Sequence, residues 1–283
     1  MKKTNWAVAA LILTAMTIAS VACNKEKTDE IQRQKITKDQ FEEIGEMHNE
    51  ILWNIGVEFK EDLHNIVLNN GISEADAMTL QARIEDWGKK YISIQMNGVC
   101  DSLLKNWHID VAWSTNAIIT DSLLNLILDQ ATSMDDLFKK IEEHEDEIYS
   151  NMTSLNDTIQ LLSLVIMRHS LGFWIDAYYN IENPWHEIAY YMPYPIDSKG
   201  LPGIWNGIKK WAKEKVAPFI MNIATAVVEL VAMDFITWTA CTAKWTRFGA
   251  LLGVPQIGFG ASVVFSAMGS AAGGVYGWTH PLF

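Results

Sequence analysis

Residues 37–71 read TKDQFEEIGEMHNEILWNIGVEFKEDLHNIVLNNG, and their apolar side chains recur every three or four positions. This period indicates an amphipathic α-helix that covers a core with one face. Thr37 with Gln40 fits a capping box at the start, and Gly71 fits a glycine stop at the end. The stretch therefore predicts one long helix. Its apolar stripe consists of Phe41, Ile44, Met47, Ile51, Ile55, Phe59, Leu63 and Ile66.

The segments that follow repeat this pattern. Further helices are predicted over about 120–131, 134–149 and 155–179. Ser133, with Asp135 and Asp136 after it, suits a helix start, because side-chain oxygens and negative charge are favoured there. Ser73 is placed to cap another helix, whose buried face we expect to consist of Ala77, Leu80, Ile84, Trp87, Tyr91 and Ile94. Strand-like alternation is confined to WHIDVAW, residues 107–113, so the fold class predicted is an all-α multi-helix bundle.

Composition and charge narrow the classes of partner. Of 283 residues 49% are hydrophobic and 20% charged, which is typical of a chain that folds around a core. Residues 24–150 contain 26 Asp and Glu against 12 Lys and Arg. A body with a net charge of −14 is repelled by nucleic acid and by anionic lipid, so we expect neither as a direct partner of this region.

The first residues have the pattern of an export signal. Lys2 and Lys3 precede an uncharged, mostly apolar run over 7–21, which is short for a membrane span. The sequence then reads Ser20-Val21-Ala22-Cys23 and turns polar. This resembles a bacterial lipoprotein signal peptide with its lipobox, although Ser20 stands where that lipobox usually has leucine. The resemblance implies cleavage before Cys23 and acylation of that cysteine.

Other readings of this segment stay open. An ordinary secretory signal cut near Ala22 would leave Cys23 as a plain thiol. If Cys23 is acylated, Asn24 favours the outer membrane of a Gram-negative cell, because it is not the aspartate that resembles an inner-membrane retention signal. Glu26, Asp29 and Glu30 are compatible with export to the cell surface, and residues 23–37 then form a flexible tether.

Two further cysteines remain, Cys100 and Cys241. In an exported protein they can form a disulfide, which would tie the acidic body to the C-terminal region. They can equally be two buried thiols that act as small hydrophobic side chains.

Residues 182–203 are predicted to form a loop. Four of the seven prolines occur here, together with Trp185, Tyr190, Tyr191 and Tyr194. Aromatic side chains on a loop can form a ligand-binding surface, or the loop can fold back and bury them.

The sequence contains few signs of catalysis. No nucleophile elbow, phosphate-binding loop or Cys-x-x-Cys pair is present, and His144 lacks the second histidine that a zinc helix needs. We predict no metal and no cofactor, and we interpret the acidic run around His144 as a solvated helix face. The pattern Gly45-x-x-His48-Asn49 resembles an uncharacterised group of Gram-negative lipoproteins with a tail rich in Gly, Ala and Ser, which implies no activity. An enzyme is less favoured than a binding protein.

Residues 204–283 form an apolar region. Residues 216–243 hold two formal charges, Lys244 and Arg247 follow, and residues 248–283 hold none. Two apolar segments around a basic turn resemble the hydrophobic hairpin of pore-forming colicins. Small residues at four-residue spacing let helix backbones approach closely. This stripe consists of Gly258, Ser262, Ser266, Ser270 and Gly274. We therefore expect another helix to cover it, either from the same body or from other chains and lipid.

Together these patterns predict a signal peptide (1–22), a tether (23–37), an acidic helical domain (38–181), a loop (182–203) and an apolar helical region (204–283). The function expected is an outer-membrane lipoprotein that acts as a binding or structural module, with an unidentified protein partner. The alternative is a membrane-active effector that inserts its C-terminal hairpin into a target bilayer.

Overall fold

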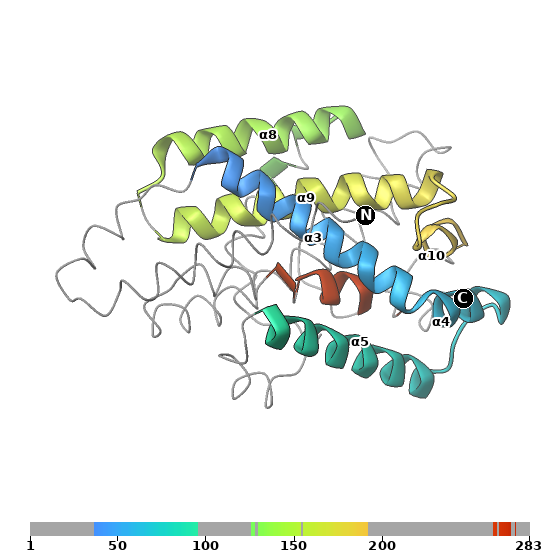
Figure 1. Cartoon of the computed structure of the whole chain (residues 1–283). Helices are drawn as coiled ribbons and strands as arrows, with labels where there is room; N and C mark the ends of the chain where they lie inside the picture. Colours follow the sequence, from blue (N-terminus) through green and yellow to red (C-terminus); the bar gives the residue numbers. More distant parts are fainter. Residues whose placement is uncertain are drawn as a thin grey trace, which may run out of the picture.

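The computed structural model of the chain describes residues 37–95, 126–127, 130–153, 155–191, 263–264, 266–272 and 275. These residues form helices joined by turns, and no strand occurs among them, so the all-α prediction is confirmed (Figure 1). Of the helix expected over about 120–131, residues 126, 127, 130 and 131 are described, and the first three are helical whereas Ala131 lies just beyond the helix.

The opening stretch forms two helices, α3 (Lys38–Glu58) and α4 (Lys60–Leu68). The capping box of Thr37 and Gln40 is confirmed. The prediction of one uninterrupted helix is wrong, because the chain changes direction at Phe59. Helix-type hydrogen bonds still run from Phe59 N to Ile55 O and from Leu63 N to Phe59 O, each at 3.0 Å. The apolar period therefore continues through the bend and gives no sign of it.

The end of α4 is a Schellman motif. Asn70 N donates to Val67 O at 3.0 Å, and Gly71 N donates to Ile66 O at 2.9 Å. The left-handed residue is Asn70, with φ 53°, and Gly71 follows with φ 134°. The stop was predicted at the right place, but Asn70 takes the position usually occupied by glycine.

Helix α5 (Glu74–Gln95) begins at Ser73, whose hydroxyl accepts from Asp76 N as predicted. Its buried face follows the expected stripe as far as Ile84. Near the C-terminal end Ile94 is exposed and Ile92 is buried instead, so that assignment is wrong. Trp87 and Tyr91 are partly buried and stack on each other, with ring centroids 5.3 Å apart.

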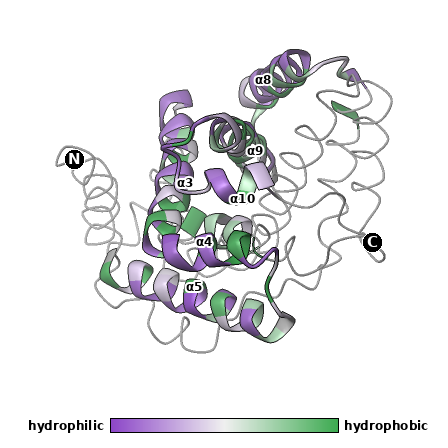
Figure 2. Cartoon of the chain, turned by 90° about the vertical axis from the view of Figure 1, so that its right-hand side faces the viewer, coloured by the Kyte–Doolittle hydropathy of each residue, from purple (hydrophilic) through white to green (hydrophobic). Residues whose placement is uncertain are grey.

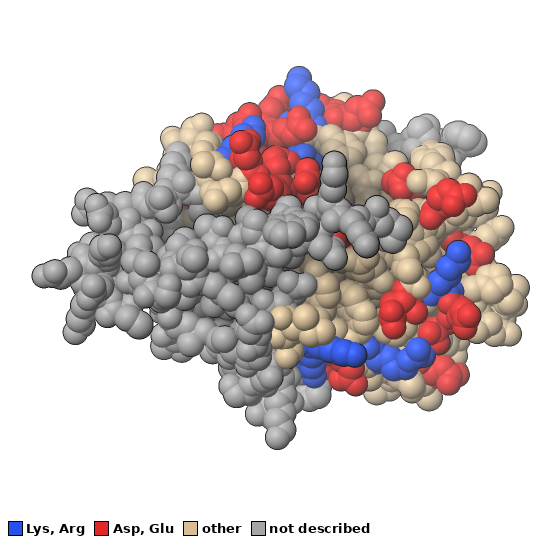
Figure 3. Space-filling view, viewed as in Figure 1, with Lys and Arg blue, Asp and Glu red and all other residues tan. Residues whose placement is uncertain are grey.

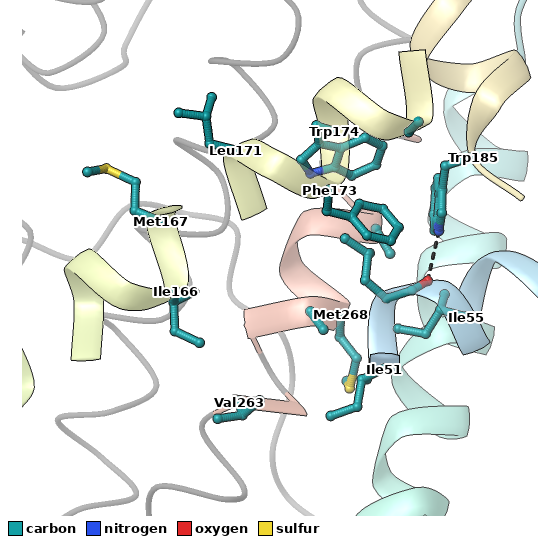
Figure 4. Close-up of a cluster of buried hydrophobic side chains, with 14 of the residues drawn as sticks. Ile51, Ile55, Ile166, Met167, Leu171, Phe173, Trp174, Trp185, Val263 and Met268 are labelled. Atoms are coloured by element: carbon teal, nitrogen blue, oxygen red, sulfur yellow. Dashed lines mark hydrogen bonds between the residues drawn. The ribbon is translucent and has the colours of Figure 1, made fainter. Parts of the chain in front are cut away.

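Helices α8 (Met134–Asn151) and α9 (Leu155–Tyr179) match the predicted ranges, and Ser133 caps α8 through Asp136 N. The segment predicted as a loop contains a short helix, α10 (His186–Tyr191). Trp185 anchors its start, because its ring is buried and its Nε1 donates to Leu52 O at 2.8 Å (Figure 4). This contact with α3 is absent from any local sequence pattern, which explains why the helix was not predicted.

Helix α9 is the centre of the arrangement. Helix α3 crosses it, and α8 and α10 also pack against it. Figure 2 shows α8 largely hydrophilic at the edge of the molecule and hydrophobic residues of α9 toward the middle. The helical residues 263–264, 266–272 and 275, called here the C-terminal segment, lie between α9 and α5 (Figure 1). They share one hydrophobic core with the acidic helices.

None of the described helices combines the length and the apolar character that crossing a bilayer requires.

Candidate functional site

Three helices contribute charged side chains to one network beside the core. Arg168 of α9 donates through Nε to both carboxylate oxygens of Glu145 of α8, at 3.0 and 3.1 Å. Its Nη2 donates to Oε1 of Glu42 of α3 at 2.5 Å. The fork of the guanidinium thus joins two carboxylates from different helices, which a lysine ammonium cannot do with the same geometry.

Burial sets the protonation properties of this network. Glu145 is 3% exposed, and burial raises its pKa to about 6 although Arg168 pulls it downward. For Glu42, which is more exposed, desolvation also acts upward, but hydrogen bonds and charge from His169 and Arg168 outweigh it and lower the pKa. The carboxylate of Glu145 is therefore easier to protonate than an ordinary glutamate, whereas that of Glu42 stays ionised to lower pH.

His169 extends the network to the backbone of α3. Its Nε2 lies 2.9 Å from Glu42 Oε2, and desolvation lowers its pKa despite that carboxylate. A Cβ built at Gly45 would overlap the His169 ring, so the absence of a side chain there permits the contact. Asn49 Nδ2 donates to His169 O at 2.9 Å, and Asn49 Oδ1 lies 3.0 Å from His48 Nδ1. The Gly45-x-x-His48-Asn49 pattern thus lies at the contact of α3 with α9.

The arrangement favours a structural clamp over acid–base catalysis. Each described oxygen of Glu42 and Glu145 already has a partner in Arg168 or His169. A general base needs a lone pair that can reach a substrate. Within the part of the chain that the structure describes, no group of three His, Cys, Asp or Glu residues is placed to hold a metal ion.

A second candidate lies where α9 meets α10, and it comes from the aromatic residues of the predicted loop. Tyr190 and Tyr191 remain exposed there, whereas Trp185 is buried. Rings from the end of α9 join them, so that five rings contact one another. We call this set the tyrosine patch, and it consists of Tyr178, Tyr179, His186, Tyr190 and Tyr191.

Several residues singled out from the sequence lie outside the described residues. These are Cys23, Cys100, Tyr194, Cys241, Gly258, Ser262 and Gly274. Two members of the small-residue stripe are described, and both Ser266 and Ser270 are fully buried. Ser270 Oγ accepts a hydrogen bond from Trp174 Nε1 at 3.0 Å. The acidic run around His144 was expected to be a solvated face, and this is wrong for Glu145, which is buried on the core side of α8. His144 itself is partly exposed, and its Nδ1 lies 3.6 Å from Glu147 Oε2.

The sequence reasoning missed Glu42, Glu145, Arg168 and His169, although signals were present. Arg168 and His169 come directly after LLSLVIM, residues 161–167, and so place two polar side chains in the middle of the otherwise apolar helix α9. Glu145 follows Leu137 and Ile141 at four-residue spacing, which puts it on the buried face of α8. A charge at such a position needs a partner, and this requirement predicts a buried ion pair without naming it.

Comparison of the chain with protein-family models, with curated proteins and with solved structures finds no match.

Proposed function

We propose that the protein is an envelope lipoprotein, anchored in the outer membrane through an acylated Cys23, whose helical body is a binding or structural module. Lys2, Lys3, the apolar run over 7–21 and the small residues before Cys23 support the anchor. Several acyl chains would hold the protein firmly, since each buried methylene contributes about 0.8 kcal/mol.

The proposal that the body is a binding or structural module rests on the burial of the C-terminal segment. Its described residues are all buried. Gln81 Nε2 donates to Ala272 O at 3.4 Å, and a Cβ at Gly88 would overlap the Met268 side chain, so α5 packs closely on this segment. Trp174 holds the other side through Ser270. An apolar segment with these contacts serves as the core of its own body.

The same contacts weigh against the membrane-active alternative. Insertion of the tail would remove Ser270 from the buried Trp174 N–H and would leave that donor unsatisfied, at a cost of about 1–3 kcal/mol. It would also expose the apolar side chains that surround Met268 in the core (Figure 4). A pore-forming activity would have to offset both costs.

Metabolic labelling with a fatty-acid analogue tests the anchor. The wild type should incorporate the label and Cys23→Ser should not, and equal labelling of both would end the lipoprotein reading. Release of a dye from liposomes tests the module. The purified mature protein should cause no release above the level of a lipoprotein of unrelated fold, whereas dose-dependent leakage would favour the effector.

A further inference from the structure

We propose that the tyrosine patch is a docking surface for cationic side chains, namely an Arg- or Lys-rich segment of a protein partner. This deepens the proposed function, because it rests on the body being a binding module and names the chemistry of what it binds.

Tyr178 and Tyr190 contact each other and link the other three rings of the patch. His186 stacks on Tyr190 at a centroid distance of 5.4 Å and an interplanar angle of 30°, and Tyr190 contacts Tyr178 at 5.2 Å. Tyr179 and Tyr191, here called the outer rings, stand nearly edge-on to these, Tyr179 against Tyr178 at 77° and Tyr191 against Tyr190 at 80°. Both outer rings are more than half exposed, so part of their surface is open to a ligand.

The outer rings are exposed but held in place. Tyr179 is 67% exposed and Tyr191 is 56% exposed. His186 Nδ1 lies 3.0 Å from the carbonyl oxygen of Ala177, which can only accept, so Nδ1 carries the proton and the ring that stacks on Tyr190 is fixed. Preorganised rings lose little conformational freedom when a ligand binds.

The stretch of chain that holds the rings carries only negative formal charge. Residues 170–191 contain three carboxylates, Asp176, Glu182 and Glu187, and no Lys or Arg. Asp176 is held by Asn183, whose Nδ2 donates at 2.9 Å, and Glu187 lies 2.7 Å from His64 of α4. Figure 3 shows carboxylates beside uncharged atoms, with Lys or Arg atoms close by, toward the end of the molecule where α9 and α10 meet.

Ring faces and carboxylates favour the same ligand. The negative face of an aromatic ring attracts a guanidinium or ammonium group, and a nearby carboxylate adds to that attraction. Anionic partners are repelled by both features and by the acidic body. A neutral glycan could stack on the rings but would gain nothing from the carboxylate charge, so the observations favour the cationic segment.

The test measures binding of a short synthetic peptide of alternating arginine and glycine to the mature lipidated protein in detergent. The control ligand is the same peptide with citrulline, which keeps the shape of arginine and removes its charge. The wild type should bind the arginine peptide and not the citrulline peptide. Equal binding of both peptides, or of neither, would overturn the proposal.

Variants separate the patch from diffuse attraction to an acidic protein. Tyr179→Ala combined with Tyr191→Ala should weaken binding about tenfold, whereas Tyr179→Phe with Tyr191→Phe should retain it, because the ring face is kept. Met78→Ala on α5 and Glu142→Gln on α8 change exposed residues elsewhere and should leave binding unchanged. Loss of binding in these controls equal to that in the double alanine variant would overturn the proposal.

A negative result of this experiment can be distinguished from failure of the proposed function. If the wild type is labelled at Cys23 and does not permeabilise liposomes, but does not bind the arginine peptide, the proposal of a cationic partner is wrong and the proposed function still holds.

Discussion

The indole nitrogen of Trp174 donates a hydrogen bond to the hydroxyl of Ser270 at 3.0 Å, and both side chains are fully buried. The bond joins α9 to the C-terminal segment across 96 residues of chain. It therefore fixes how the uncharged tail sits on the acidic helices. A buried N–H of this kind is costly to leave without an acceptor, so the pair contributes orientation as well as stability.

A double-mutant cycle on this pair measures its contribution. Ser270→Ala should destabilise the protein by about 1–3 kcal/mol, because the indole N–H loses its acceptor. Trp174→Phe removes the donor together with part of a large buried ring, and the double variant should lose less than the sum of the two single losses. The measurement is denaturant unfolding of all four proteins. Strictly additive losses would mean that the hydrogen bond contributes nothing.

Two glycines in helices give a matched test of close packing. A Cβ at Gly56 of α3 would overlap the indole of Trp185 and the ring of Pro184, whereas a Cβ at Gly172 of α9 meets no atom within 4 Å. Gly56→Ala should therefore cost about 1–3 kcal/mol through overpacking. Gly172→Ala should gain about 1 kcal/mol from helix propensity. Melting temperatures should shift in opposite directions, and a shared direction would show that Gly56 is not a packing contact.

Because of the ionic network around Arg168, the difference in stability between the wild type and Glu145→Gln should depend on pH. The pKa of Glu145 is raised from 4.5 to about 6, so this group stabilises the fold below pH 4.5 and loses that contribution as the pH rises through 6. The lowered pKa values of Glu42 and His169 act in the opposite sense, since their contributions are lost as the pH falls. Glu145→Gln removes only the first effect, provided that its neighbours keep their geometry.

The stability of Glu145→Gln relative to wild type should therefore increase as the pH rises from about 3.5 to about 7, by about 2 kcal/mol in total. Urea unfolding of both proteins across this range measures the difference. Glu142→Gln on the same helix is the control for loss of one carboxylate, since Glu142 is exposed. A difference that stays constant with pH would mean that Glu145 titrates in the fold as it does in the unfolded chain.

The helix starts were predictable because their causes are local. Thr37 and Ser133 each accept a hydrogen bond from a backbone N–H three residues later, and the sequence contains both groups. The bend at Phe59 and the helix at His186–Tyr191 were not predictable in this way. The bend keeps the apolar period, and the helix depends on Trp185, whose acceptor at Leu52 lies 133 residues away.

In the candidate sites, too, local features were predictable from the sequence and long-range partners were not. Periodicity puts Glu145 on the buried face of α8, but nothing near it in sequence names Arg168 as its partner. The small-residue spacing predicts that Ser266 and Ser270 lie at a close helix contact, and it does not tell which helix covers them. Long-range pairing decides both, and a single sequence does not contain that information.

The substitution Ser270→Leu distinguishes the packed tail from the membrane-active tail, because the two alternatives predict different changes in stability and in liposome binding. The substitution makes the C-terminal segment more hydrophobic, so a segment that partitions into lipid should bind liposomes more strongly. A segment packed in its own body has no room at Ser270 and should lose about 1–3 kcal/mol, in addition to the acceptor for Trp174. We expect a lower melting temperature of the purified mature protein and unchanged liposome binding, because the close contact with Trp174 dominates. Unchanged stability together with stronger liposome binding would reject the packed tail and favour the membrane-active reading.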